Sequence, residues 1–406
     1  MITPSLAMIP QAYKSGKVYS QLPVSGSGDL DFTRASAATR INKDGFIEEV
    51  GANVPRLDYS NGGCPSLLLE PTRLQKIQYS EDFTSSWGSG SSTITSNQGI
   101  SPNGTLNADL VSSVSVNGNV STSHTVLNDS LITTQSIFVK YISGTSNFML
   151  RGAFVGGTAT AKASKFNLAT ASVISTDTSA SIEYYGNGWY RVSQQIANNS
   201  SGNTTLVYQN FTTNDATSTN QLLLWGAQTE VGSYPTSYIP NYGTSAGVTR
   251  SAETANGAGD ASTFNNSEGV LYAEISSEND STNKQISIND GSSSNRISII
   301  LNAATNGVVA STNVGGSDTN LYVLTTNNVA LFNKFAYKYK ANDFSFWING
   351  VEQTAIISGG SVPLVNLSQL DFNIGSGANP FRGNVKDVRV YNTALTDAEL
   401  QALTTL

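Results

Sequence analysis

Residues 381–406 read FRGNVKDVRVYNTALTDAELQALTTL, and this stretch decides the fold class of the C-terminal part of the chain. Val388 and Val390 alternate with charged and aromatic neighbours, and such a period of two predicts a β-strand with one buried face. Thr396 and Glu399 have the spacing of a capping box, in which each side chain accepts a hydrogen bond from the backbone N–H of the other residue. The pattern therefore predicts a strand followed by a short helix that begins directly after Thr396.

Apolar residues around the same helix are placed for a hydrophobic staple. Leu395 precedes the cap and Leu400 lies one turn inside the helix, so we expect the two side chains to pack together. Upstream, residues 344–352 predict a hairpin, because Asn349-Gly350 favours a tight type I′ turn between two strands. One short helix after many strand-like segments indicates an all-β domain that this helix closes.

Composition excludes some classes of partner. Only 13% of the 406 residues are charged, against roughly 25% in an average soluble domain, and the net charge is −7. Nucleic acid needs a basic surface, which 22 Lys and Arg spread over this length do not supply. The sequence has no apolar stretch long enough for a membrane-spanning helix, so we expect no membrane insertion.

The chain has a single cysteine, Cys64, and a single histidine, His124. These counts exclude a disulfide framework and histidine-rich metal sites, and we expect both residues to be structural. The first twenty residues lack the basic and apolar regions of a secretory signal. A polar composition without an export signal favours a virion protein that is assembled in the cytoplasm of a host cell.

The distribution of strand-like segments predicts four parts. Residues 1–73 hold little periodic apolar sequence and are expected to be an N-terminal segment for virion attachment and oligomerisation. Many short strands follow in residues 74–250, residues 251–265 are small and polar as in a linker, and residues 266–406 again show strands. We therefore expect an all-β chain of two tandem β-sandwich (jelly-roll) domains, preceded by an irregular N-terminal assembly segment.

An ordered series of segments characterises the C-terminal domain. It comprises the strand before the Asn349-Gly350 turn, residues 373–376 (NIGS), residues 381–391 (FRGNVKDVRVY) and the closing residues 395–403. In this order the segments resemble the laminin-G / concanavalin A-like superfamily. The resemblance implies a lectin-like sandwich.

Two further resemblances cover most of the remaining chain. The middle domain resembles carbohydrate-binding-like jelly rolls of phage structural proteins, through residues 79–87 (YSEDFTSSW), 188–191 (GWYR), 225–228 (WGAQ) and 232–240 (GSYPTSYIP). The N-terminal stretch is similar to the leader of the same class of proteins, through residues 32–40 (FTRASAATR), 45–48 (GFIE) and 53–59 (NVPRLDY). Together they imply a phage fibre or decoration protein that contacts other virion proteins through residues 1–73. By analogy with phage fibres we expect a homo-oligomer, and a trimer in particular.

Sugar recognition requires an accessible aromatic face together with fixed polar groups for the hydroxyls. Tyr184, Tyr185 and Asn187 combine these properties at a predicted turn and are our candidates for glycan binding. Trp347 alternates with its neighbours in a strand, which suits either a core position or a sugar-binding one. The other tryptophans lie inside the motifs named above and are expected in the core: Trp87, Trp189 and Trp225.

No cofactor is required by this scheme, but Ca²⁺ is an open possibility. Laminin-G-like domains often bind this cation at the rim of the sandwich, through oxygen ligands. Asp290, Asp318 and Asn349 lie at predicted turns and could contribute such ligands. The alternative is that they are ordinary solvated turn residues.

Three functions remain open. The favoured one is a virion structural protein whose lectin-like domains bind cell-surface or mucosal glycans, or a host receptor. The alternative is a purely structural decoration or spacer protein without a ligand. A polysaccharide depolymerase is least favoured, because the nearest carboxylate pairs do not suggest two facing groups; these pairs are Glu48-Glu49, Glu81-Asp82 and Asp397 with Glu399. We therefore expect a protein that is not an enzyme.

Overall fold

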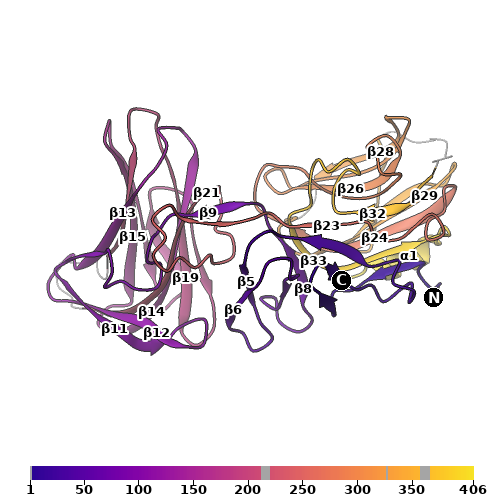
Figure 1. Ribbon diagram of the computed structural model, residues 1–406. Coiled ribbons are helices and arrows are strands. Elements are labelled where there is room, and N and C mark those ends of the chain that lie inside the picture. Colours follow the sequence, from indigo (N-terminus) through magenta and orange to yellow (C-terminus); the bar gives the residue numbers. More distant parts are fainter. Residues whose placement is uncertain (1, 212–219, 326–327, 357–365) are drawn as a thin grey trace. The chain divides into compact units, whose positions relative to one another are not determined.

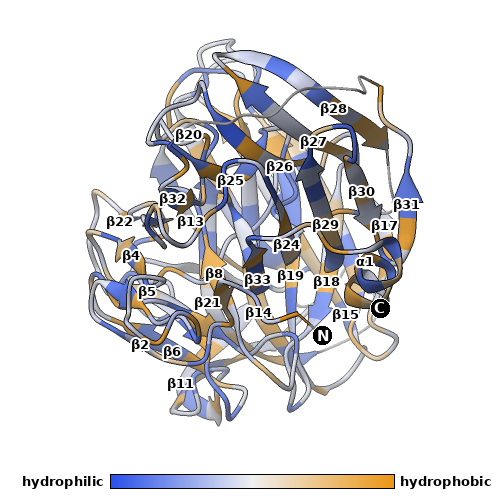
Figure 2. Ribbon diagram, turned by 90° about the vertical axis from the view of Figure 1, so that its right-hand side faces the viewer, coloured by the Kyte–Doolittle hydropathy of each residue, from blue (hydrophilic) through white to orange (hydrophobic). Residues whose placement is uncertain are grey.

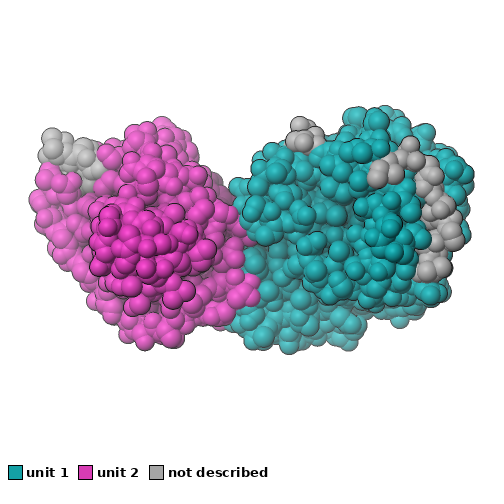
Figure 3. All heavy atoms as spheres, turned by 90° about the horizontal axis from the view of Figure 1, so that it is seen from above, with its two compact units in different colours: residues 1–43, 50–71, 251–406 teal, residues 44–49, 72–250 magenta. Residues whose placement is uncertain are grey.

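The computed structural model describes residues 2–211, 220–325, 328–356 and 366–406, and these form two compact units (Figure 3). Unit 1 consists of Met1–Lys43, Val50–Pro71 and Ser251–Leu406, and unit 2 consists of Asp44–Glu49 and Thr72–Arg250. In sequence, unit 2 is thus inserted into unit 1. The prediction of an all-β chain with β-sandwich domains is confirmed, because both units are built from antiparallel sheets (Figure 1).

Unit 2 contains two six-stranded antiparallel sheets. The first has the order β10 (Gly88–Gly90), β13 (Asn119–Thr125), β20 (Thr205–Phe211), β15 (Asn147–Val155), β16 (Thr160–Asn167) and β17 (Ser172–Thr176). The second has the order β11 (Ser92–Ile100), β12 (Leu106–Ser113), β21 (Gln221–Val231), β14 (Ile132–Ser143), β19 (Trp189–Ala197) and β18 (Ala180–Tyr184). A short pair, β9 (Arg73–Gln75) and β22 (Val248–Arg250), completes the unit.

The core of unit 2 follows from alternation along its strands. In β20, Leu206, Tyr208 and Asn210 are buried while the residues between them are half-buried. Figure 2 shows the same mixture of apolar and polar residues along individual strands. Apolar side chains from the two sheets, such as Val139 and Phe148, meet in one core cluster. This packing of two inner faces is that of a β-sandwich.

Unit 1 contains a larger pair of sheets. The eight-stranded sheet has the order β31 (Val351–Gln353), β30 (Ser345–Ile348), β29 (Asn333–Lys340), β24 (Glu268–Ser277), β33 (Gly383–Tyr391), β8 (Ser66–Leu69) and β7 (Leu57–Asp58), with β1 (Leu6–Met8) also paired to β33. The five-stranded sheet has the order β28 (Ser317–Thr325), β27 (Gly307–Val314), β26 (Arg296–Asn302), β25 (Lys284–Asn289) and β32 (Gln369–Asp371). A third sheet comprises β2 (Tyr13–Lys14), β3 (Lys17–Val18), β4 (Leu30–Thr33) and β23 (Thr254–Asn256). Of the remaining strands, β5 (Ala38–Ile41) belongs to unit 1, and β6 (Ile47–Val50) lies mostly within residues 44–49 of unit 2.

Most of the N-terminal segment is an integral part of unit 1, which differs from the separate assembly segment that we expected. Leu6, Phe32 and Leu67 are all at most 1% exposed and share one core with residues of β24 and β33. Local sequence could not show this, because each strand is short and its partner lies hundreds of residues away. Whether residues 1–73 also attach the protein to a virion remains a prediction.

Residues 251–265 also differ from the expected linker. Glu253 is fully buried, β23 pairs with β4, and Ala255 and Ala258 belong to the core of unit 1. The small side chains that suggested a flexible connection instead allow close packing. The segment is therefore structural.

The C-terminal strand and helix form as predicted. Val388 and Val390 are buried in β33, and α1 (Asp397–Thr404) begins after Thr396 with a complete capping box to Glu399. α1 lies on the outer face of the eight-stranded sheet. Leu400 packs there against side chains of the sheet, and together they form a small apolar cluster that is separate from the main core of unit 1. It is the only helix in the described residues, and its eight residues are far too few to cross a membrane.

Candidate functional site

The turn between β18 and β19 in unit 2 carries three of the predicted glycan-binding residues. The backbone N–H of Tyr185 donates to Trp189 O at 2.9 Å, and the N–H of Trp189 donates to Gly186 O at 2.9 Å. Gly186, Asn187 and Gly188 all have positive φ, at 81°, 52° and 78°. Glycine and asparagine tolerate this left-handed conformation best, so the sequence YGNG specifies a tight turn here.

A small pocket of about 140 Å³ lies beside this turn. Trp189 forms part of its lining; this side chain is 2% exposed and its Nε1–H donates to Ile100 O at 3.0 Å. Residues 44–49 of the same unit reach the pocket, because the N–H of Ile47 donates to Pro102 O at 2.9 Å. The full lining comprises Gly45, Phe46, Ile100, Ser101, Pro102, Lys140, Tyr185, Gly186, Asn187 and Trp189.

Two tyrosines of the turn differ in their accessibility. Tyr184 is 60% exposed and its ring rests against that of Tyr190, with centroids 5.3 Å apart. Tyr185 is half-buried and meets the ring of Phe138 edge-on, at 4.9 Å and 86°. Tyr184 therefore offers an aromatic surface to solvent, while Tyr185 is held in place as a wall of the pocket.

Two polar side chains that line the pocket are available to bind a ligand. The half-buried side chain of Lys140 and the exposed side chain of Asn187 make no hydrogen bond within the described part of the chain. An ammonium group and an amide in this position can both bind hydroxyl groups of a ligand. The turn, the exposed ring of Tyr184 and these free groups together define our candidate site, which we call the turn pocket.

The fourth predicted glycan-binding residue, Trp347, lies in unit 1 and is remote in sequence from the turn pocket. It is 7% exposed and packs with Leu400 of α1 on the outer face of the eight-stranded sheet. Its Nε1–H donates to Ser345 Oγ at 3.3 Å. Because the helix covers its ring, we do not include Trp347 in the candidate site.

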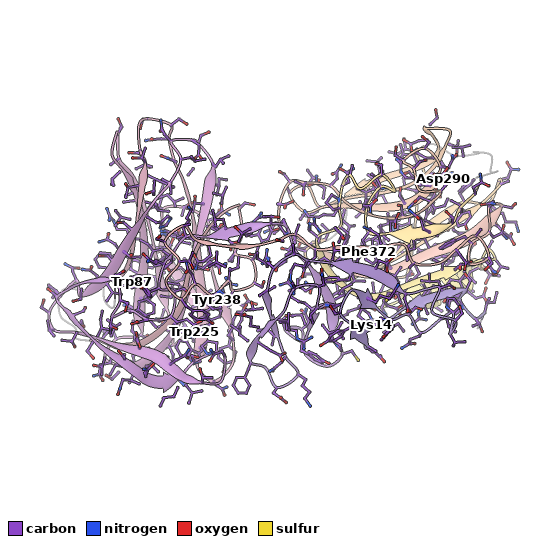
Figure 4. The ribbon with its side chains drawn as sticks, in the orientation of Figure 1. Lys14, Trp87, Trp225, Tyr238, Asp290 and Phe372 are labelled. Carbon is purple, nitrogen blue, oxygen red and sulfur yellow. The ribbon has the colours of Figure 1, made fainter. Side chains whose placement is uncertain are left out.

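Of the remaining tryptophans, Trp189 and Trp225 are buried as expected, whereas Trp87 is half-buried and packs against the core of unit 2. Trp225 is 1% exposed, and its ring lies 4.6 Å from that of Tyr238, centroid to centroid (Figure 4). Trp87 packs against Phe83 at 4.6 Å and donates from Nε1 to Tyr79 O at 2.9 Å. These rings stabilise unit 2 and leave Tyr184 as the accessible aromatic surface at the turn pocket.

The three candidate calcium ligands do not form one site. Asp290, on a loop of unit 1 (Figure 4), accepts hydrogen bonds from Ser292 and from Asn295, whose side chain also accepts from the backbone of Gly315 at 3.0 Å. The hydrogen bond between Asn295 and Gly315 thus links this loop to the β27–β28 hairpin that carries Asp318. The carboxylate of Asp318 itself accepts a hydrogen bond from the side chain of Asn313.

Asn349 lies on a different hairpin. Its side chain accepts from the N–H of Lys334 at 2.9 Å and donates to Asn333 at 2.8 Å. Within the described ranges, no three His, Cys, Asp or Glu side chains come together as metal ligands. Asp290, Asp318 and Asn349 thus do not form one shared set of ligands, and calcium binding stays an untested prediction.

Several acidic residues singled out in the sequence have structural roles. Glu399 caps α1, and Asp82 accepts hydrogen bonds from Thr84 and Ser85. Glu81 accepts from Tyr238 at 3.0 Å and from Asn107 at 2.9 Å, and burial raises the pKa of its carboxyl group.

Sequence analysis missed the pocket residues that come from other strands. Lys140 ends the apolar run of β14 and is paired with Trp189, while Phe46 belongs to residues 44–49. Neither residue is near the turn in sequence. The pairing of β14 with β19 could have suggested Lys140, since directly paired residues lie on the same face of a sheet.

Comparison with known proteins gives a clear result for one part of the chain. Residues 249–401 match the family model of the concanavalin A-like lectin/glucanases superfamily. This lectin/glucanase-like segment corresponds to most of unit 1 after the insertion. No curated protein is significantly similar to the chain.

Three solved structures illustrate the more distant similarities. The CBM40 of the Ruminococcus gnavus IT-sialidase, bound to α2,3-sialyllactose, is 17% identical over 36% of this chain and 86% of its own, with a TM-score of 0.30. The NanB sialidase of Streptococcus pneumoniae is 11% identical over 36% of this chain, with a TM-score of 0.31, and the match spans only 25% of that enzyme. Domain 4 of the arabinanase AbnA of Geobacillus stearothermophilus, in complex with arabinotriose, is 15% identical over 38% of this chain and 73% of its own, with a TM-score of 0.31. At such low TM-scores these similarities carry no functional argument.

Proposed function

We propose that this chain is a non-enzymatic glycan-binding protein whose unit 2 binds a saccharide at the turn pocket. The observation that carries the proposal is a pocket in which the ring of Tyr185 lies with the free side chains of Lys140 and Asn187, at a turn that also carries the exposed ring of Tyr184. A pyranose presents an apolar face that stacks on an aromatic ring and hydroxyl groups that need donors and acceptors. The match of residues 249–401 to a superfamily of lectins and glucanases supports a role in saccharide recognition for unit 1 as well.

Such a site would act through many copies. A pocket of about 140 Å³ can hold only part of a saccharide, and a single site with millimolar affinity provides roughly 4 kcal/mol. Several copies on one particle raise the effective affinity by orders of magnitude. This requirement agrees with our expectation of a homo-oligomer.

We further propose that these copies are displayed on a phage virion, as a fibre or decoration protein that contacts cell-surface or mucosal glycans. The support is the resemblance of residues 32–59 and 79–87 to phage structural proteins. Because the N-terminal segment is folded into unit 1, the virion-attachment surface would be a face of that unit. The second candidate, a spacer without a ligand, is favoured by the core positions of Trp189 and Trp225.

The test is a glycan array probed with the full chain at high valency, with and without Ca²⁺. We expect specific binding that Tyr184→Ala or Lys140→Ala weakens at least roughly tenfold. Tyr141→Ala is the matched control, since Tyr141 is an exposed tyrosine of the same unit that lies neither on the turn between β18 and β19 nor in the pocket lining. Absence of all binding would favour the spacer, and binding unaffected by Tyr184→Ala and Lys140→Ala would exclude the turn pocket.

A further inference from the structure

A second cavity, in unit 1, lies on the outer face of the eight-stranded sheet beside α1. Its volume is about 540 Å³, which is within the range of small-molecule sites. It contains none of the residues that sequence analysis selected as glycan or calcium ligands. We call this cavity the helix groove.

The register of three strands places a row of charged side chains on the floor of the helix groove. Glu274 of β24 is paired with Lys334 of β29 on one side and with Asp387 of β33 on the other. Two residues before Glu274 in β24, Tyr272 is paired with Arg389 of β33. Directly paired residues share a face, so all five side chains line the same cavity.

Most of these charges are already compensated. The guanidinium of Arg389 forms two hydrogen bonds to the carboxylate of Asp387, at 3.0 and 2.6 Å. Asp387 is only 8% exposed, and burial raises the pKa of its carboxyl group despite this partner. The ammonium group of Lys334 donates to Thr405 O at 2.8 Å, away from its cross-strand neighbour.

Glu274 is the exception. Its half-buried carboxylate takes part in no hydrogen bond and no ion pair with any described residue, although it faces a cavity and has Asp387 as its neighbour. A partly desolvated charge without a partner is unfavourable. A ligand that brings a positively charged donor to this position would remove that cost.

The wall of the helix groove has a different character. Ala398, Ala402 and Leu403 of α1 and Ile2 present apolar surface to the cavity. Below them, Arg389 lies over the ring of Tyr272, with the guanidinium carbon 5.8 Å from the centroid. The groove thus joins an apolar wall to a polar floor, an arrangement that suits a ring with one apolar face and a polar edge.

We propose that the helix groove binds an amino sugar. Its ammonium group pairs with Glu274 and approaches Asp387, its hydroxyl groups bond to the Arg389 guanidinium, and its apolar face lies against Ala398 and Ala402. The proposal extends the proposed glycan-binding function to a second site in the other unit and names the class of sugar. It rests on that function only for the choice of a saccharide as the ligand.

The experiment is saturation-transfer difference NMR on the full chain at mildly acidic pH, with glucosamine, glucose and ethanolamine as probes. We expect a stronger response from glucosamine than from either glucose or ethanolamine. Glu274→Gln should weaken glucosamine binding roughly tenfold, and Ala402→Trp should fill the groove and abolish it.

Each variant has a control of the same kind. Glu352→Gln removes one negative charge from an exposed strand position outside the groove, and Gln401→Trp adds the same ring to an exposed position of α1 that does not line it. Both should leave binding unchanged, as should Tyr184→Ala in the turn pocket.

Three results would overturn the proposal. They are absence of a glucosamine response, a response insensitive to both Glu274→Gln and Ala402→Trp, and an equal response to ethanolamine, which would indicate a site for simple amines. Glucosamine binding lost in Tyr184→Ala but kept in both groove variants would support the turn pocket and exclude the helix groove. The opposite pattern would exclude the turn pocket as the site for this sugar.

Discussion

Arg56 and Glu253 lie 197 positions apart in the sequence and form an ion pair that is fully buried in unit 1. The Nε–H of Arg56 donates to Oε1 of Glu253 at 2.6 Å, and Arg34 donates to the same oxygen at 2.8 Å. The other carboxylate oxygen accepts from the backbone N–H of Glu70 at 2.8 Å. Glu253 thus joins three points of the N-terminal segment to the chain where it returns from unit 2.

Removing the carboxylate of Glu253 should lower the stability of unit 1. Glu253→Gln leaves two buried guanidinium groups with one fewer negative partner, and we expect a loss of about 3–5 kcal/mol in the free energy of unfolding of unit 1. Urea denaturation followed by tryptophan fluorescence and circular dichroism would measure it. Lys17→Met, which breaks the exposed pair with Asp31, is the control and should cost at most about 1 kcal/mol. Similar losses for both variants would contradict the structural role of Glu253.

Because unit 2 is inserted into the sequence of unit 1, we expect unit 1 to fold after unit 2 has been removed. Within unit 1 the N–H of Glu253 donates to Glu70 O at 3.2 Å, so the two ends of the interruption already meet. Replacing residues 72–250 by a short Gly/Ser linker should leave unit 1 folded, with a cooperative thermal transition. Deleting residues 1–71 should instead unfold unit 1, because it removes β1, β8 and their core side chains. A cooperative transition of unit 1 in the second deletion, or none in the first, would refute the assignment.

The closing helix should depend more on its buried leucine than on its cap. Leu400 is fully buried beside Trp347, so Leu400→Ala should reduce the free energy of unfolding by about 2–5 kcal/mol. Thr396→Ala removes one side of the capping box and should cost about 1 kcal/mol. Thermal denaturation would rank the two, with the exposed Gln401→Ala as a control near zero. The reverse ranking would mean that α1 contributes little to packing.

His124 should make unit 2 sensitive to acid. Burial, helped by the nearby charge of Lys76, lowers the pKa of this imidazole from 6.5 to about 4. The unfolded chain therefore binds a proton at a pH where the folded protein does not, and the free energy of unfolding falls as the pH drops from 6.5 to about 4. The fall due to this one residue should approach about 3 kcal/mol.

His124→Gln isolates this contribution. Glutamine can keep a hydrogen bond to Thr229 Oγ1, which His124 Nε2 approaches at 3.2 Å, but it does not titrate. Urea midpoints at neutral pH and at about pH 4 should differ less in the variant than in the unsubstituted protein. An equal difference in both would assign the acid sensitivity to carboxyl groups instead.

Local patterns predicted the parts of the fold that local chemistry specifies. The capping box of Thr396 and Glu399 and the Asn349-Gly350 turn each depend on a few adjacent residues, and both form as expected. The place of residues 1–71 could not be predicted in this way, because their strands pair with residues near the other end of the chain. Long-range strand pairing leaves almost no trace in a single short segment.

The candidate sites show the same limit. Tyr184, Tyr185 and Asn187 lie on one turn, so the sequence could select them together. Lys140 completes the pocket from another strand. The helix groove was missed entirely, since Glu274 and Asp387 are 113 positions apart by their numbers and become neighbours only through the pairing of β24 with β33.

The pairing of β1 and β8 with β33 has a consequence for biosynthesis. Ser5 donates from Oγ to Val390 O across 385 positions, so the first strand finds its partner only after residue 390 has left the ribosome. Domains generally fold as units while synthesis proceeds, and unit 2 is complete by residue 250. The nascent N-terminal strands must wait with unpaired edges until β33 emerges. Prematurely terminated chains would therefore expose these edges to aggregation and to chaperones.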